Sequence, residues 1–600
     1  MRTKKGSPQP KEQVWRSTQA LSILILLIAV VAVYANSLRN EFLFDDLETI
    51  VRLQTAGGSG PFGQLVKLIT RGVAYRPVRS ASYAFDYALS GLNPVGYHVG
   101  NIAYHALSAL FVFLIAEIIC GRGRIALFVA LLFALHPIQT DAVTYLSGRR
   151  DVLSGLFVLA GFYTFLRYRA LGSNRFLGLT VLLYLLAFLT KESGIVLPLL
   201  CFAYDLVSRM SLTRPTWALP PFGAIWTAAR SAFRDGRRLY LPLAAIAGGL
   251  VVYVLFFVRG TWVRAYHGGS LWFTILTMAR VTLHYLSLLV APITLNADYS
   301  YNGFPVTTSW TDLRAWMAIL ILVALGSMIL SCLRSRPVVA FGGMWFFLSL
   351  LPVSQIVPHH EMMAEHYLYV ATAGYALALG GLLKPWLEHQ PAARALQVGS
   401  VVLLLLLGLR TVWRNRDWKD DVTLWSKTVQ TAPQVARARN NLGVAYLRRG
   451  ELTRSELELE AAVQIKPDLA IAHGNLGKIY LDRGELERAE RELQSAIRLK
   501  ENEVIPRLWL GAVFLRQERL PEAEQQFRAA LARPPYDAYA YNNLGILFAK
   551  NGRMVEAESA FQAALTRMPD LIEARQNLAR LRRLQGSSEP VAQPAVGAVP

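Results

Sequence analysis

The chain is 600 residues long, 53% of them hydrophobic and 17% charged, with a formal net charge of +21 at pH 7. The length requires at least two structural units, and the low charged fraction excludes an ordinary soluble protein, in which about 25% of residues are charged. The positive charge does not indicate nucleic acid binding, because the basic residues lie mainly in short segments between apolar runs, where Lys and Arg anchor membrane helices.

The N-terminal segment, residues 1–17, is basic and precedes an apolar run from about Leu21 to Val33. No small-residue cleavage site follows it, so we expect a retained signal-anchor with a cytoplasmic N-terminus and an external first loop at 36–96. Apolar runs of about 18 or more residues can cross a bilayer as helices. Within a membrane domain at 18–412 we place about eleven spans, at residues 18–35, 98–119, 124–137, 152–168, 176–190, 194–208, 239–258, 313–333, 338–354, 367–384 and 395–412.

A further apolar stretch at 271–293 decides the topology. Counting it as one crossing would put the loop with Arg334 and Arg336 outside, against the preference of basic loops for the cytoplasm. We therefore interpret this stretch, with Arg280 and His284 in its middle, as an interfacial or re-entrant helix pair. The C-terminal part of the chain then lies outside; a single crossing at 271–293 would move it to the cytoplasm.

After residue 412 a pattern repeats every 34 residues, the period of tetratricopeptide repeats. The recurring triplets are Asn441-Leu442-Gly443, Asn475-Leu476-Gly477, Trp509-Leu510-Gly511 and Asn543-Leu544-Gly545. Units at 436–469, 470–503, 504–537 and 538–571 plus a capping helix predict an α-solenoid over 413–585. Its concave groove could bind an extended peptide or a partner protein; alternatively, the array is a spacer or a dimer contact. Glu501 and Glu518 replace the expected Pro and Gly of the third unit. Residues 586–600 read as a disordered tail, and the fold class expected for the chain is all-α.

The first external loop carries two adjacent carboxylates, Asp45 and Asp46, directly after the first span. Carboxylates at a membrane surface are costly unless they are hydrated, paired or used. Either could act as a general base toward a hydroxyl. Alternatively, Asp46 caps the start of a helix.

Basic residues also gather on the predicted external face. Arg149 and Arg150 lie there although basic residues usually prefer the cytoplasmic side of a membrane protein. Paired arginines suit a phosphate or diphosphate headgroup. With Lys191 and Arg259 they are our candidates for binding the phosphate of a lipid-linked donor. Lys191 and the adjacent Glu192 could equally form a structural ion pair.

Further candidates for the acceptor or sugar site are Arg76, His98, Glu192, His359, His360 and Glu365. His98 could also be a hydrogen-bonded packing residue. His359 and His360 are consecutive and lack the i, i+4 spacing of a helical zinc site, so we predict neither a metal nor another cofactor. The combination predicts an enzyme in which a carboxylate deprotonates an acceptor hydroxyl while cations neutralise the departing lipid phosphate at the outer face.

Several motifs occur in a characteristic order: Asn40 through Asp46, Tyr75-Arg76-Pro77, Gly91 through Pro94 with Tyr97-His98, His136-Pro137, Gly148-Arg149, Lys191-Glu192, and Glu365 through Tyr369. In this order they resemble the transmembrane and tetratricopeptide-repeat-containing O-mannosyltransferases, which are type C glycosyltransferases. The resemblance covers nearly the whole chain, including repeats after the spans.

The resemblance implies inverting, metal-independent transfer of a sugar from a polyprenyl-phosphate donor to Ser or Thr of a protein acceptor. It implies a catalytic acidic residue in the first external loop, here Asp45 or Asp46, and repeats in the same compartment. The repeats are fewer than in the animal members and His366 stands where Arg is expected, which indicates a bacterial inner-membrane protein with periplasmic repeats; a eukaryotic member would lie in the endoplasmic reticulum membrane. The sugar, mannose in the animal members, stays open.

A second hypothesis is non-enzymatic. In it, the chain is a membrane scaffold whose repeats recruit partner proteins. The two hypotheses differ in whether the membrane part binds a polyprenyl-phosphate sugar.

Overall fold

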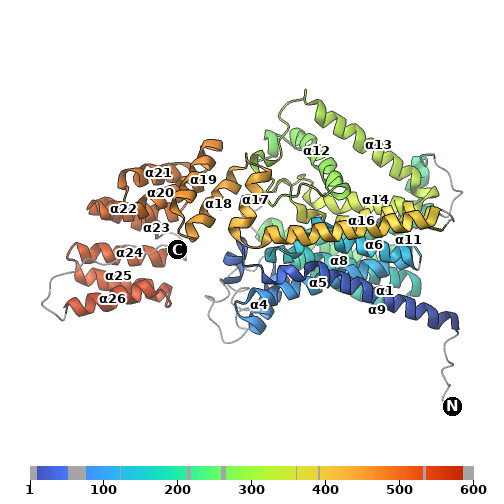
Figure 1. The fold of residues 1–600 in the computed structure, drawn as a ribbon, viewed down its shortest axis with the longest axis horizontal. Coiled ribbons are helices and arrows are strands. Elements are labelled where there is room, and N and C mark those ends of the chain that lie inside the picture. Colours follow the sequence, from blue (N-terminus) through green and yellow to red (C-terminus); the bar gives the residue numbers. More distant parts are fainter. Residues whose placement is uncertain are drawn as a thin grey trace, which may run out of the picture. The chain divides into compact units, whose positions relative to one another are not determined.

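The computed structural model describes residues 10–51, 76–121, 123–211, 218–257, 265–359, 361–388, 392–531 and 536–585 (Figure 1). Within these ranges the chain forms α-helices joined by short 3₁₀ or π turns, without β-strands, in agreement with the expected all-α fold. It divides into two compact units. The membrane unit comprises Met1–Ser300 and Phe304–Lys427, and the repeat unit comprises Tyr301–Gly303 and Thr428–Pro600.

The membrane unit is a bundle of helices, most of them apolar, and the last of them continues into the repeat unit. They are α1 (Pro10–Tyr34), α4 (Pro77–Ser90), α5 (Pro94–Ile119), α6 (Arg124–Leu135), α7 (Thr140–Val143), α8 (Arg149–Leu171), α9 (Asn174–Thr190), α10 (Leu197–Met210), α11 (Phe222–Phe257), α12 (Leu271–Val290), α13 (Leu313–Ser335), α14 (Pro337–Leu350), α15 (Leu368–Glu388), α16 (Ala392–Asn415) and α17 (Asp421–Thr431). Short turns lie between them, namely η2 (Leu47–Val51), η3 (Pro137–Gln139), η4 (Leu146–Gly148), η5 (Glu192–Val196), η6 (His267–Gly269), η8 (Leu351–Val353) and η9 (Glu365–Tyr367).

Six helices of the described residues are long and apolar enough to cross a membrane: Ser17–Arg39, Pro94–Ile119, Glu192–Met210, Leu271–Val290, Leu313–Ser335 and Arg394–Trp418. A seventh candidate is the pair Arg124–Leu135 and Pro137–Val143, which is bent by 47°. Helix α9 is apolar but has only 17 residues, so it is about 25 Å long against the roughly 30 Å of a hydrocarbon core. The chain is thus a multi-pass membrane protein with six or seven candidate spans by length and composition, fewer than the eleven expected.

The expected helix pair at 271–293 is wrong, because Leu271–Val290 forms one continuous helix, α12. Neither Gly nor Pro interrupts it, and Ser270 caps its start by accepting a hydrogen bond from the backbone N of Phe273. Arg280, whose charge suggested a break, lies 3.3 Å from Asp312 and donates to the carbonyl of Pro305 at 3.0 Å. The charge is neutralised by a partner beyond the helix, so α12 continues through it.

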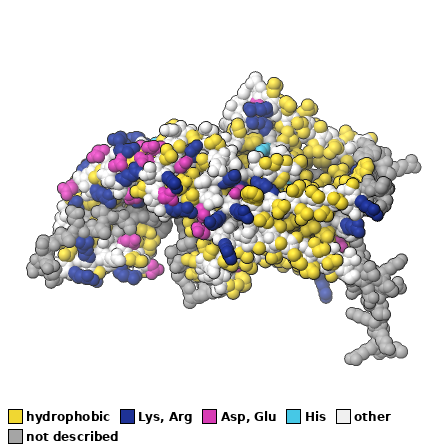
Figure 2. Space-filling view, in the orientation of Figure 1, with side chains coloured by type: hydrophobic (Ala, Val, Ile, Leu, Met, Phe, Trp, Pro, Cys, Tyr) yellow, Lys and Arg dark blue, Asp and Glu magenta, His cyan; other side chains and the backbone are white. Residues whose placement is uncertain are grey.

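Large apolar side chains cover the outer faces of α13 and α16. Those exposed include Trp316, Leu320, Val323, Val401, Leu405 and Leu409. In Figure 2 hydrophobic side chains dominate this surface, whereas acidic and basic side chains alternate over the repeat helices. An exposed apolar surface of this extent is typical of helices that contact lipid.

Helices α14 and α15 pack with their backbones close together. A Cβ added to Gly342 would lie 2.4 Å from the backbone N of Ala378, and one added to Gly374 would lie 2.7 Å from the backbone N of Phe346. Small residues at such crossings allow close helix packing inside a membrane. This contact fixes η8 and η9, which flank the two helices and carry polar residues of the site below.

The repeat unit is a series of helix pairs. Its helices are α18 (Ala436–Arg448), α19 (Leu452–Ile465), α20 (Ala470–Arg483), α21 (Leu486–Leu499), α22 (Ile505–Arg516), α23 (Leu520–Ala530), α24 (Asp537–Lys550), α25 (Met554–Arg567) and α26 (Ile572–Gln585). Within a pair, a Cβ at Gly477 would lie 2.5 Å from Cγ of Leu493, so only glycine allows this close contact. Glu518, at the position of Gly484 in the preceding repeat, also adopts a left-handed backbone with φ of 62°. The turn of the third unit therefore forms despite the replaced glycine.

Candidate active site

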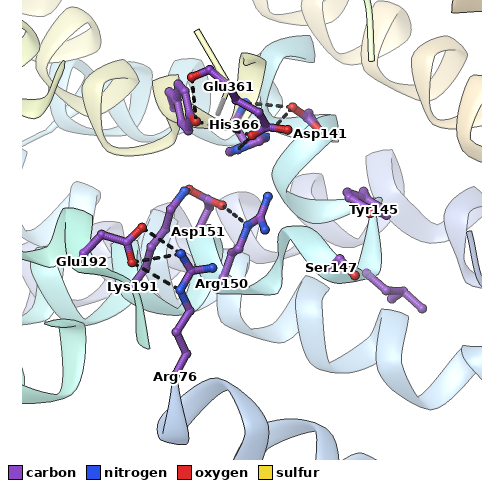
Figure 3. A network of polar contacts seen from close by, with 12 residues as sticks. Arg76, Asp141, Tyr145, Ser147, Arg150, Asp151, Lys191, Glu192, Glu361 and His366 are labelled. Carbon is purple, nitrogen blue, oxygen red and sulfur yellow. Dashed lines mark hydrogen bonds and ion pairs between the residues drawn. The ribbon is translucent and has the colours of Figure 1, made fainter. Parts of the chain in front are cut away.

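A small cavity lies in the membrane unit where the predicted external segments meet. Figure 3 shows the network of polar side chains around it. Its volume is about 70 Å³, and it is lined by Arg76, Arg150, Lys191, Glu192, Ser193, Pro352, Val353, His359, Glu361, His366 and Tyr367. These residues come from the start of α4, from α8, from η5 and from the segment between α14 and α15. Segments far apart in the sequence thus contribute three cations and two carboxylates to one cavity wall.

Arg76 and Glu192 form a two-pronged ion pair. Nη2 of Arg76 donates to both carboxylate oxygens of Glu192, at 2.7 and 2.9 Å, and Nε donates at 3.3 Å. Both side chains are largely buried. Arg76 precedes Pro77 at the first turn of α4, so this pair ties the end of the first loop to η5.

Asp151 joins the other two cations of the cavity. Its Oδ1 accepts a hydrogen bond from Nζ of Lys191 at 2.5 Å, and its Oδ2 lies 3.5 Å from Nε of Arg150. Burial opposes ionisation of Asp151, but the neighbouring charges of Lys191 and Arg150 bring its pKa below the usual value. Lys191 therefore pairs with α8 and not with the adjacent Glu192, which pairs with Arg76.

Several carboxylates surround the guanidinium of Arg150. Burial alone would lower the pKa of its guanidinium, but the carboxylates of Asp151 and Glu361 raise it, and Asp45 acts in the same direction. Nε of Arg150 has no hydrogen-bond partner among the described residues. The guanidinium is therefore held charged at the cavity wall.

Arg149, the neighbour of Arg150, lies outside this cavity. Its side chain is fully buried, 2.5 Å from Asp86, and donates to Oδ1 of Asn101 and to the carbonyl of Tyr97, both at 2.7 Å. Its guanidinium also stacks on the Tyr83 ring at 4.6 Å. Successive residues of a helix point about 100° apart, which sends Arg149 into the α4–α5 packing and Arg150 into the cavity.

The two carboxylates of the first loop differ in their surroundings. Asp46 is fully buried; its Oδ1 accepts from the backbone N and Oγ of Ser147, at 2.7 and 2.6 Å, and its Oδ2 accepts from the N of Leu43 at 3.0 Å. Burial raises the pKa of Asp46 to about 7, although these hydrogen bonds act to lower it. Asp45 is only half buried, and its charge acts on Arg150 and Tyr145.

Two other candidates lie away from the cavity. His98 is buried with Nε2 3.2 Å from the carbonyl of Asn40, which agrees with its reading as a packing residue. Glu365 is buried, and its Oε1 accepts from Tyr299 Oη at 2.8 Å and from the N of Asn296 at 2.5 Å. Burial raises the pKa of Glu365 to about 7. Arg259 and His360 lie outside the described residues.

The structure also brings in residues that sequence reasoning did not select. Asp141 binds His366 through the backbone N and Nδ1, both at 2.9 Å from Oδ2, and Nε2 of His366 lies 3.8 Å from Glu361 (Figure 3). Asp151 was likewise missed. A sequence signal existed, since Asp141, Asp151 and Glu361 are acidic residues within or beside predicted external segments that already contained candidate cations.

The described part of the chain contains no cluster of three or more His, Cys, Asp or Glu residues arranged to hold a metal ion. What the site offers is an arrangement of hydrogen-bond donors and charges. Three cations at a cavity wall can bind an anion such as a phosphate, and nearby carboxylates can accept a proton.

Comparison with known proteins supports both units. A tetratricopeptide repeat model matches residues 410–470, 474–538 and 510–572. The chain is 28% identical over 457 residues to the protein O-mannosyl-transferase F38B6.6 of Caenorhabditis elegans, covering 73% of this chain and 61% of the relative. It is 26% identical to the mouse protein O-mannosyl-transferase TMTC3, covering 70% and 49% of the two chains. It thus spans about half to three fifths of the length of these relatives.

Among solved structures, a thermophilic tetratricopeptide protein of Thermus thermophilus matches 30% of this chain and 95% of its own length, with 23% identity and a TM-score of 0.25. The protein O-mannosyl-transferases above match 73% and 70% of this chain, whereas the main segment of the repeat unit is only Thr428–Pro600, so their similarity includes much of the membrane unit. The chain is therefore a homologue of the TMTC protein O-mannosyl-transferases, with tetratricopeptide repeats at its C-terminal end.

Proposed function

We propose that this protein is a membrane glycosyltransferase that transfers a sugar, mannose by analogy with its relatives, from a polyprenyl-phosphate donor to a hydroxyl of a protein acceptor. The observation that carries the proposal is the cavity with Arg76, Arg150 and Lys191 beside the loop of Asp45. The similarity to proteins named protein O-mannosyl-transferases supports the reaction class.

The cations serve the donor phosphate. Arg150 and Lys191 are held by a shared carboxylate, Asp151, which leaves their remaining N–H donors available to a phosphate oxygen. Positive charge fixed in advance stabilises the negative charge that develops on the departing phosphate without further rearrangement. Arg149 is excluded from this role because its donors are used within the α4–α5 packing.

Asp45 is the general base in this proposal, and Asp46 holds the loop in place. The three hydrogen bonds to Asp46 and its complete burial keep it from a substrate hydroxyl. Asp45 is accessible and close enough to Arg150 to raise its pKa. A base must come within hydrogen-bond reach of the proton that it removes, which favours Asp45.

We further propose the external or periplasmic face for the reaction, with eleven crossings and α12 lying along that face. Before α12, Nε2 of His267 is 3.0 Å from the carbonyl of His359; after it, the N of Asn296 donates to Glu365. The segment between α14 and α15 thus contacts both ends of α12. A helix crossing a hydrocarbon core of about 30 Å has its ends on opposite faces, so these contacts support a non-crossing α12. The repeats, which follow α16 in the chain, would then lie in the same compartment as the site, where they could bind the acceptor polypeptide.

The test uses the full chain in lipid nanodiscs with a synthetic polyprenyl-phosphate mannose and a Ser/Thr-rich peptide. We expect mass spectrometry to detect peptide carrying one added hexose, and none when the donor is omitted. The corresponding polyprenyl-phosphate glucose tests which sugar is used. Absence of both transfer and donor binding would support the scaffold hypothesis in its place.

A further inference from the structure

His366 stands out in the cavity wall because Nδ1 of its ring is hydrogen-bonded, whereas Nε2 has only Glu361, at 3.8 Å, beside it. Nδ1 and the backbone N both bind Oδ2 of Asp141, at 2.9 Å. Nε2 is buried without a hydrogen-bond partner among the described residues, and the residue itself is only 6% exposed. A buried polar atom without a partner is costly in a folded protein, which points to a ligand for Nε2.

The contact between Asp141 and His366, called the dyad below, determines which ring nitrogen of His366 faces that ligand. An ionised carboxylate can only accept hydrogen bonds, so Nδ1 carries a proton toward Asp141 and Nε2 faces the other way. On that side His366 lines the cavity of Arg150 and Lys191, and also a second cavity of about 20 Å³ beside it. The Asp141 contact alone would explain a structural role for Nδ1 and the backbone, but it leaves Nε2 unexplained.

Charged groups of both signs surround the imidazole. Asp141 on α7 faces Nδ1, Asp151 on α8 interacts electrostatically with the ring, and Glu361 lies 3.8 Å from Nε2. The cations of the same wall are Arg150 and Lys191, and His359 and Tyr367 complete it. Oη of Tyr367 lies 3.4 Å from Glu361, so Glu361 has another partner when a ligand takes its place near Nε2.

Resting on the proposed function, we propose that protonated His366 is a further catalytic residue that binds the phosphate of the donor through Nε2 and gives it a proton, with Asp141 as its positioning residue. The acceptor oxygen forms a bond to the anomeric carbon of the sugar, and the bond from that carbon to the phosphate oxygen breaks. The electron pair stays on the phosphate oxygen, which takes the proton of Nε2, while Asp45 takes the proton of the acceptor hydroxyl. Neutral His366 regains its proton from solvent after the products leave.

The test measures binding to the full chain in nanodiscs between pH 5.5 and pH 8, with farnesyl phosphate as the probe and inorganic phosphate as the comparison. The wild type is expected to bind farnesyl phosphate more tightly at low pH. His366→Gln should lose about tenfold or more in affinity at pH 5.5 and little at pH 8. His366→Arg keeps a cation that does not titrate, so its binding should stay tight across the range.

Asp141→Asn keeps an acceptor for Nδ1 but removes the negative charge, so the midpoint of the pH curve should move to lower pH. A merely structural role for the dyad would change affinity without moving this midpoint. Parallel pH curves for the wild type and His366→Gln, with both folded, would overturn the proposal while leaving the donor class intact. No binding of farnesyl phosphate by the wild type at any pH overturns the donor class, and the role of His366 with it. Equal affinity for inorganic phosphate would assign the site to free phosphate and overturn the role in a lipid-linked donor.

Discussion

Ser147 donates two hydrogen bonds to one carboxylate oxygen of Asp46, from its backbone N at 2.7 Å and from Oγ at 2.6 Å. This contact joins the loop that carries Asp45 and Asp46 to η4, directly before α8. Arg150 is the second residue of α8, which follows η4 directly. The loop with Asp45 is therefore connected through Ser147 to the segment that places Arg150 in the cavity wall. Asp45 and Arg150, the base and the phosphate-binding cation of the proposed mechanism, come from distant segments and are linked in this way.

This arrangement predicts different consequences for the two carboxylates. Asp45→Asn should reduce transfer at least 100-fold with little loss of thermal stability, since it removes a base at an accessible position. Asp46→Asn should destabilise the membrane unit by about 1–3 kcal/mol, because an amide NH2 replaces an acceptor facing the N of Leu43. Transfer kinetics and detergent-solubilised melting curves check both. Wild-type transfer by Asp45→Asn would contradict its assignment as base.

Asp46 also predicts a pH dependence of stability. Its pKa is raised from 3.8 to about 7 in the folded protein, so between these values the folded state holds a proton that the unfolded state has lost. Stability contributed by this group is present below the unfolded value and decreases as pH rises from about 4 to 7. Melting temperatures of the wild type should fall over this range, and those of Asp46→Asn should fall less. Equal slopes would mean that Asp46 does not titrate there.

Arg149 and Arg150 form a matched pair of adjacent residues. Arg150→Gln should raise the KM for the polyprenyl-phosphate donor about tenfold or more while the melting temperature changes little, because the side chain lines the cavity. Arg149→Gln should destabilise by about 3 kcal/mol or more, because it leaves the buried Asp86 without its charge partner. The reverse outcome, donor binding lost with Arg149 and stability lost with Arg150, would contradict the division of roles.

The close contact of α14 and α15 can be tested with two glycines of neighbouring helices. Gly342→Ala places a methyl group 2.4 Å from the backbone N of Ala378, which should cost about 1–3 kcal/mol. Gly326→Ala on α13 is the control, since nothing lies within 4 Å of its added Cβ and alanine favours helix. Melting curves of the two variants should separate clearly. Similar stabilities would argue against the described packing.

The placement of α12 is open to chemical labelling. Ala265 and Ser309 flank α12 and are both exposed, and the three native cysteines are buried. With Ala265→Cys and Ser309→Cys, a membrane-impermeant maleimide should label both variants from the external side of intact cells. Labelling of Ser309→Cys only after permeabilisation would mean that α12 crosses the membrane, and would place the repeats in the cytoplasm.

The sequence by itself determined the helical class, the multi-pass membrane character and the repeats. These depend on local periodicity and apolar content, as with the 34-residue spacing of Gly443, Gly477, Gly511 and Gly545. The tetratricopeptide match confirms the repeats, and the chain is similar to protein O-mannosyl-transferases over most of its length, as the resemblance of its motifs indicated. The continuity of α12 was missed because the distant Asp312 neutralises Arg280, a contact between segments that the local pattern does not contain.

Only the tertiary structure decided which polar residues meet. Adjacent residues have different surroundings. Arg150 faces the cavity, whereas Arg149 is buried against α4 and α5. Asp45 is half buried, whereas both carboxylate oxygens of the buried Asp46 accept hydrogen bonds. Sequence gives a residue's neighbours along the chain, but its partners depend on the direction in which a helix presents it and on the segments packed there. For the same reason the Asp141–His366 contact, across 225 residues, became visible only in the folded chain.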